Sequence, residues 1–136
     1  MIRNRLCLLK ISLCDFVYSI SVFTHLPEDM QLRWLEELSR VTKPDGVLAL
    51  SVHGAGLFNG NPQQKKDFNK AGFYYLKGSG TTGLPEFYQT AYHAEEYIYS
   101  RWSKFFTIVK IRPRGIANRQ DLVLCQPRFN GRSRPK

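Results

Sequence analysis

Cysteine is scarce in this sequence, and the few cysteines present are scattered. Cys7, Cys14 and Cys125 form no CxxC pair and have no spacing typical of metal ligands. Zinc sites need clustered ligands, so the sequence predicts no metal site. An odd, dispersed set also argues against a disulfide framework and favours a reducing compartment. We therefore expect a cytoplasmic protein.

Long hydrophobic runs are also absent. The longest uncharged apolar stretch covers residues 16–26 and ends at Pro27, whereas a membrane span needs about 20 residues. The apolar segment after the basic N-terminus is interrupted by Lys10. A secretory signal peptide has an unbroken apolar core, so this segment does not match one. We expect no membrane partner.

Acidic residues are few, with 11 Asp and Glu against 20 Lys and Arg, which gives a net charge of +9. Seven of the basic residues lie in residues 1–14 and 127–136, and the other 13 nearly balance the 11 acids within residues 15–126. A nucleic-acid-binding domain carries its basic excess on a folded face. The charge distribution therefore predicts a solvated, disordered basic tail at 127–136 and argues against a nucleic-acid partner.

The first half of the chain reads as strand, helix, strand. Residues 16–23 are β-branched and aromatic with almost no charge, which predicts a strand buried on both faces of a parallel sheet. Pro27 and two following acids suit a helix start. A single helical face then collects the apolar residues Trp34, Leu35, Leu38 and Val41. Residues 43–46, Lys-Pro-Asp-Gly, predict a helix stop in a turn, and residues 47–52 predict a second buried strand.

The second half is more irregular. Residues 53–92 contain seven glycines and two prolines, so we expect a long loop that acts as a lid, with a short strand at 73–76. Residues 93–104 predict a helix whose inner positions are Tyr97, Ile98 and Trp102. Residues 105–111 and 121–125 predict two strands, and their short connection favours an antiparallel pair.

These elements and several local motifs resemble the class I S-adenosylmethionine-dependent methyltransferases. The most specific stretches are DFVYSISVFTHL at 15–26, LSRVTKPDG at 38–46 and GLPEFY at 83–88. The resemblance covers residues 15–126 and implies strands 4 to 7 of a seven-stranded sheet with order 3-2-1-4-5-7-6. It implies an α/β fold with a partial doubly wound, Rossmann-like sheet, mostly parallel with an antiparallel C-terminal strand.

The family's glycine-rich cofactor turn and its ribose-binding acid precede strand 4, and residues 1–14 contain no counterpart of either. We therefore expect residues 1–14 to be a divergent or truncated N-terminus and residues 15–126 to be the C-terminal half of a methyltransferase domain. The intact family member would use S-adenosylmethionine to methylate a small-molecule or glycan-like acceptor. We expect this chain to be inactive alone.

The resemblance also implies where ligands would lie. In open parallel sheets they bind beyond the carboxyl ends of the strands. Family contacts to the cofactor at the end of strand 4 carry over to Ser19, Ile20, Ser21 and Val22.

On the acceptor side the candidates are His25, Tyr92 and His93. His53 follows the second strand and is the candidate general base, because an imidazole exchanges protons near neutral pH.

Two alternatives to an enzyme follow from the same residues. An unpaired strand at 16–23 would be a long apolar edge, so the chain could be a non-catalytic module that pairs with itself or with an upstream partner chain. A basic protein that binds nucleic acid through its termini is the further alternative, and loss of binding on removal of residues 127–136 would support it.

Overall fold

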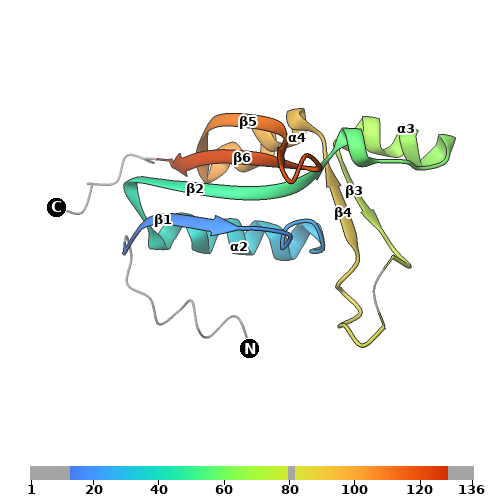
Figure 1. Ribbon diagram of the computed structural model, residues 1–136, viewed down its shortest axis with the longest axis horizontal. Coiled ribbons are helices and arrows are strands. Elements are labelled where there is room, and N and C mark those ends of the chain that lie inside the picture. Colours follow the sequence, from blue (N-terminus) through green and yellow to red (C-terminus); the bar gives the residue numbers. More distant parts are fainter. Residues whose placement is uncertain (1–12, 80–81, 129–136) are drawn as a thin grey trace.

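The computed structural model describes residues 13–79 and 82–128 of the 136-residue chain (Figure 1). The segments predicted at 1–14 and 127–136 lie almost wholly outside the described residues. The elements, in chain order, are β1 (Cys14–Ser19), α2 (Glu28–Val41), β2 (Thr42–Gly54), the 3₁₀ turn η1 (Ala55–Leu57), α3 (Pro62–Ala71), β3 (Phe73–Leu76), β4 (Thr90–His93), α4 (Glu95–Arg101), the 3₁₀ turn η2 (Trp102–Lys104), β5 (Phe106–Ile116) and β6 (Gln120–Pro127).

The main sheet has the order β1-β2-β6-β5 (Figure 1). β1 and β2 are parallel, and β6 lies between β2 and β5 and runs antiparallel to both. This order corresponds to strands 4, 5, 7 and 6 of the predicted sheet, so the predicted α/β class and partial Rossmann-like sheet are confirmed. β4 continues beside the end of β2 in parallel, where Gly54 lies opposite His93, and β3 pairs antiparallel with β4.

Helix α2 forms as its apolar spacing predicts. Glu28 and Asp29 occupy the first turn, where the positive end of the helix dipole favours acids. Leu35, Leu38 and Val41 are buried against the sheet. Trp34 is only partly buried and packs against the edge of the core.

The predicted turn at 43–46 is wrong, because these residues already belong to β2. The register explains the difference: Cys14 lies opposite Thr42, yet Phe16 lies opposite Val47, so the extra residues bulge out of the ladder. A Cβ on Gly46 would lie 2.9 Å from the carbonyl oxygen of Asp15. A residue without a Cβ is therefore needed at position 46 for β1 and β2 to approach this closely.

The strand predicted at 16–23 is shorter and less buried than expected. β1 ends at Ser19, and within the described part of the chain it pairs only with β2. Phe16 and Tyr18 are 58% and 69% exposed. Burial on both faces is therefore wrong, whereas the apolar edge strand is present.

Residues 53–92 are not the predicted loop. They contain α3, β4 and the strand predicted at 73–76, which is confirmed as β3. Asn61 caps α3 by accepting from the backbone N–H of Gln64, whose side chain bonds back to the Asn61 N–H, and Pro62 occupies the first turn. Gly72 ends the helix in the left-handed conformation at φ 74°.

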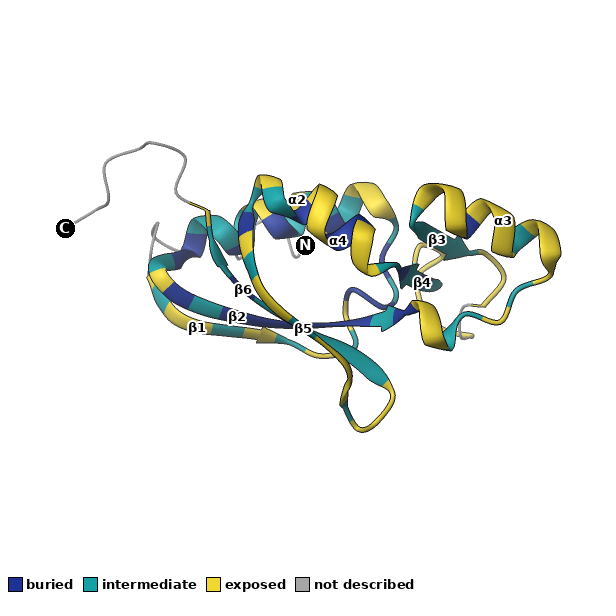
Figure 2. Ribbon diagram, turned by 90° about the horizontal axis from the view of Figure 1, so that it is seen from above, coloured by how far each residue is buried: buried dark blue, intermediate teal, exposed yellow. Residues whose placement is uncertain are grey.

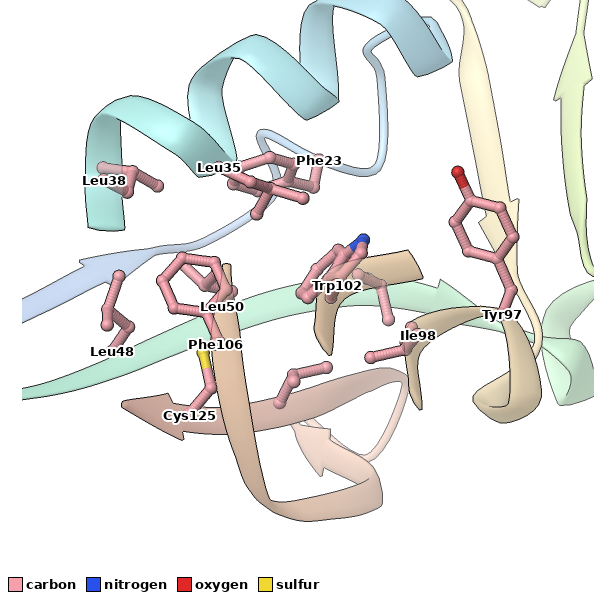
Figure 3. Packing of buried hydrophobic residues seen from close by; sticks show 12 residues of the cluster. Phe23, Leu35, Leu38, Leu48, Leu50, Tyr97, Ile98, Trp102, Phe106 and Cys125 are labelled. Atoms are coloured by element: carbon pink, nitrogen blue, oxygen red, sulfur yellow. The ribbon is translucent and has the colours of Figure 1, made fainter. Parts of the chain in front are cut away.

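The core lies between the main sheet and helices α2 and α4 (Figure 3). Trp102, Phe23 and Phe106 are its largest buried side chains, and the rings of Phe23 and Trp102 lie 5.7 Å apart. Tyr97, Ile98 and Trp102 are buried, as predicted. The expected helix 93–104 is α4 with η2, and it begins two residues later because His93 ends β4 instead.

Figure 2 shows α2 and α4 on the same side of the main sheet. No helix of segments 13–79 and 82–128 covers the other side. On β1 the exposed Phe16 and Tyr18 alternate with Val17, which packs against the core, so they face this uncovered side. Large apolar side chains rarely gather on a free surface without a partner. In these same segments, no helix has the length and apolar content needed to cross a bilayer.

Candidate functional site

The carboxyl ends of β1 and β2 meet in a polar network. Ser21 follows β1 with φ 59°, a left-handed conformation that is uncommon outside glycine. Its backbone N–H donates to Ser51 Oγ at 2.9 Å, and Gln120 Nε2 donates to Ser21 Oγ at 2.7 Å. Gln120 Oε1 is buried without a hydrogen-bond partner among the described residues. Gln120 Oε1 is therefore an unpaired hydrogen-bond acceptor near the carboxyl ends of β1 and β2, where ligands bind in open α/β sheets.

His25 lies in the loop between β1 and α2, and its ring is held on two sides. Nδ1 lies 2.7 Å from the carbonyl oxygen of Gln89. A carbonyl oxygen can only accept, so Nδ1 carries the hydrogen and Nε2 carries the lone pair of the neutral ring. Tyr88 stacks on the ring with 4.3 Å between centroids and an interplanar angle of 17°.

His53 stands edge-on to His25, with 6.0 Å between ring centroids. Its Nδ1 is buried and has no hydrogen-bond partner in the described part of the chain. Burial lowers the pKa of His53, and the nearby charges of His25 and Arg119 lower it further, against a smaller raising effect of the Ala91 backbone. His53 is therefore neutral and poorly placed to gain a proton at Nδ1.

His93 is a core residue. Gln31 Nε2 donates to the carbonyl oxygens of Phe23 and Leu26 at 3.0 and 2.7 Å, which leaves Gln31 Oε1 as the acceptor for His93 Nε2 at 2.7 Å. Burial lowers the pKa of His93 to about 3, and His53 adds to this effect. The neutral His93 and Gln31 thus fasten the loop after β1 to the core.

The structure places the candidate cofactor residues together. Ser19 ends β1, and Ile20, Ser21 and Val22 follow it in the loop. Ile20 and Val22 are 42% and 44% exposed, on either side of the polar Ser21. The end of β1 therefore offers apolar surface and hydrogen-bonding groups side by side.

The acceptor-side candidates are only partly brought together. His25, His53 and Tyr92 lie in one aromatic cluster, where the rings of His53 and Tyr92 are 5.5 Å apart. His93 points into the core instead. Tyr88 joins this cluster by stacking on His25; it ends the GLPEFY stretch, whose resemblance to the family implies no role for this tyrosine.

A separate open hollow of about 380 Å³ lies beyond the end of β2, and neither His25 nor His53 lines it. Both charge signs are present on its wall. It is lined by Ala55, Gly56, Leu57, Ala94, Glu95, Glu96, Pro113, Arg114, Arg119 and Asp121. Asp121 Oδ1 accepts a hydrogen bond from the backbone N–H of Arg114 at 3.0 Å. Over the segments that the structure describes, no group of three His, Cys, Asp or Glu residues is placed to hold a metal ion.

Comparison with known proteins agrees with this geometry. A family model described as "Methyltransferase domain" matches residues 9–50, which include β1, the site loop, α2 and most of β2. This chain carries a class I methyltransferase-like domain. The predicted resemblance is thereby confirmed, and the matched family supports a methyltransferase-like function.

One similar solved structure is that of PH0226 protein from Pyrococcus horikoshii OT3. The TM-score is 0.54 and the identity 14%, over 89% of this chain and 55% of that chain. The methyltransferase-like chain thus spans about half the length of PH0226, and a likeness at this identity shows the fold alone. A search of curated protein sequences finds no match.

Proposed function

We propose that the chain provides part of the site of a cytoplasmic S-adenosylmethionine-dependent methyltransferase that acts on a small-molecule or glycan-like acceptor. The observation that carries this proposal is the polar, partly unpaired end of β1 within a sheet of the methyltransferase order. The free thiols of Cys14 and Cys125 are compatible with the cytoplasm.

The residues at the end of β1 fit S-adenosylmethionine chemically. Ile20 and Val22 offer exposed apolar surface suited to a flat base, while Ser21 and the unpaired Gln120 Oε1 offer hydrogen-bonding groups suited to hydroxyl or amino groups. When bound, the cofactor supplies a methyl group on a positively charged sulfur that leaves as a neutral thioether. Positioning of two reactants is then the main contribution of the protein.

A binding experiment tests this proposal. We expect S-adenosylmethionine to shift the backbone NMR signals of residues 19–22 in the 136-residue chain, with weak affinity and without methyl transfer by the chain alone. Gln120→Leu should weaken binding about tenfold through loss of one buried hydrogen bond. Gln126→Leu is the matched control, because Gln126 is half-buried and donates one hydrogen bond, to the Asp45 carbonyl, at the far end of β6. Absent shifts, or shifts that map elsewhere, would refute the proposal.

A second function is favoured by the exposed edge of the sheet. We propose that β1 also pairs with β1 of a second copy, since Phe16 and Tyr18 are largely exposed on an edge strand that could accept another strand. The solution mass should then be that of a dimer. Tyr18→Lys should give a monomer, whereas Tyr99→Lys, at an exposed tyrosine on α4, should stay dimeric. A wild-type monomer at all concentrations would exclude this function.

A further inference from the structure

Three groups beyond the cofactor candidates share the carboxyl edge of the sheet: the imidazoles of His25 and His53 and the phenol ring of Tyr88. Both imidazoles keep a ring nitrogen without a hydrogen-bond partner among the described residues, but that of His53, Nδ1, is buried. His25 donates from Nδ1 to the Gln89 carbonyl oxygen, and its Nε2 makes no hydrogen bond within the described segments. A base that is oriented by a second group and keeps a free lone pair is the arrangement that general-base catalysis requires.

We propose that His25 is the proton acceptor of this site and that the acceptor substrate carries a hydroxyl group. The inference rests on the proposed function and deepens it by assigning the base and the chemical class of the acceptor. A hydroxyl group is a poor nucleophile until it loses its proton, whereas a thiol ionises readily and needs less help.

The surroundings of His25 suit the charge that forms on proton transfer. The imidazolium would lie against the face of Tyr88, which attracts a cation. His53 is the other titratable group in ring contact, and it stays neutral, so it does not repel the new charge. Proton uptake at His53 Nδ1 would instead create a buried donor without an acceptor.

The reaction balances with these groups. The hydroxyl proton passes to His25 Nε2, and the acceptor oxygen gains the electron pair of the O–H bond. This oxygen forms a bond to the methyl carbon as the carbon–sulfur bond breaks. The sulfur leaves as a neutral thioether, and the proton remains on His25 until it is lost to water.

Two measurements on the wild-type chain test the tautomer of His25 and the accessibility of its free ring nitrogen. Long-range ¹H–¹⁵N NMR of the three histidines should show His25 as the Nδ1–H tautomer. Diethylpyrocarbonate, which attacks an accessible neutral imidazole nitrogen, should modify His25 about tenfold faster than His53, since buried groups react only through local opening. An Nε2–H tautomer at His25, or faster modification of His53, would overturn the proposal.

Proton transfer itself is tested with 4-nitrophenol, a hydroxyl compound whose ionised form absorbs visible light. In mildly acidic buffer, the wild-type chain should bind the probe in its ionised form. His25→Asn keeps a donor for the Gln89 carbonyl but removes the base, so its bound probe should stay protonated. Gln126→Leu, at the far end of β6, is the control and should still ionise the probe. Equal ionisation by His25→Asn, loss of ionisation in both variants, or no binding would each contradict the proposal.

These tests need no S-adenosylmethionine, so their outcome is separate from that of the proposed function. Loss of cofactor binding at residues 19–22 would remove the methyltransferase proposal and leave the ionisation result standing for His25. Cofactor binding together with a protonated 4-nitrophenol on the wild-type chain would keep the methyltransferase and overturn the assignment of His25.

Discussion

Acidification should destabilise the folded chain through the buried His93. Its ring is enclosed by Phe73, Tyr97 and Trp102, with centroid distances of 5.1 to 5.9 Å. Nε2 donates to Gln31, while Nδ1 is buried and has no partner in the described part of the chain. A second proton would therefore form a buried, unpaired donor on a charged ring.

The magnitude follows from the pKa. The ordinary pKa of histidine is 6.5, and burial lowers that of His93 to about 3. The unfolded state then binds more protons between these values, so stability is full above the unfolded pKa and falls as the pH drops through it. One pKa unit corresponds to about 1.4 kcal/mol. From pH 7 to pH 5, His93 alone should cost about 2 kcal/mol of unfolding free energy.

Urea unfolding followed by tryptophan fluorescence measures this loss, since Trp102 packs on His93. His53 also has a lowered pKa, so the quantity to test is the difference between the wild type and His93→Gln. Glutamine can still donate to Gln31 but does not titrate. We expect the wild type to lose about 2 kcal/mol more than His93→Gln between pH 7 and pH 5. Equal losses would refute this assignment of the pH dependence.

Three further sites can be tested by substitution and urea unfolding. Gly54→Ala would place Cβ 1.9 Å from Asp121 Oδ2 and should lower the free energy of unfolding by about 1–3 kcal/mol. The control is Gly56→Ala, whose Cβ meets open space and which should change stability little. Similar losses for the two variants would contradict this prediction. Asn61→Ala removes the cap of α3 and should cost about 1 kcal/mol, with faster amide exchange in 62–71, and unchanged exchange would count against it. Leu50→Ala empties a fully buried site and should cost about 2–5 kcal/mol; a cost under about 1 kcal/mol would show that the core is loose there.

The sequence predicted the regular first half of the domain well, for a physical reason. Helix α2 carries its apolar residues on one face over fourteen residues, and that pattern alone specifies a helix against a sheet. The strand order came from the family resemblance, not from periodicity. The prediction that residues 16–23 are buried on both faces failed because an apolar run fits an edge strand and a central strand equally well. Only the pairing distinguishes them, and among the described strands β1 pairs with β2 alone.

The second half was harder because its elements are short or have little apolar surface. Phe68 is the single buried residue of α3, so no apolar stripe marks the helix. The signal in the sequence is the capping box, in which Pro62 follows Asn61 and Gln64 lies three residues after Asn61. β4 has only four residues and is held by strand pairs that are distant in sequence, which local propensity cannot reveal.

The candidate site shows the same limit at the level of single groups. His25 and His53 could be chosen from their positions after strands, but their roles depend on contacts that the sequence does not show. Gln89, which fixes the tautomer of His25, lies 64 residues away in the chain. Burial of His53 Nδ1 likewise follows from packing, which is why we propose His25 as the base in place of His53, the candidate from the sequence.

The core histidine and the proposed proton acceptor are connected by one buried amide. Gln31 binds His93 and also the carbonyl oxygens of Phe23 and Leu26, which lie on either side of His25 in the chain. The orientation of Gln31, with Nε2 toward both carbonyls, depends on a donor at its oxygen, and the neutral His93 supplies that donor. We expect a proton on His93 to favour expulsion of the ring from the core, because Nδ1–H would be a buried donor without an acceptor among the described residues; this would free Gln31 and then the loop that carries His25. The geometry of the site edge therefore depends on a core group that is far from it in sequence, which explains why the sequence could identify the histidines but could not separate their roles.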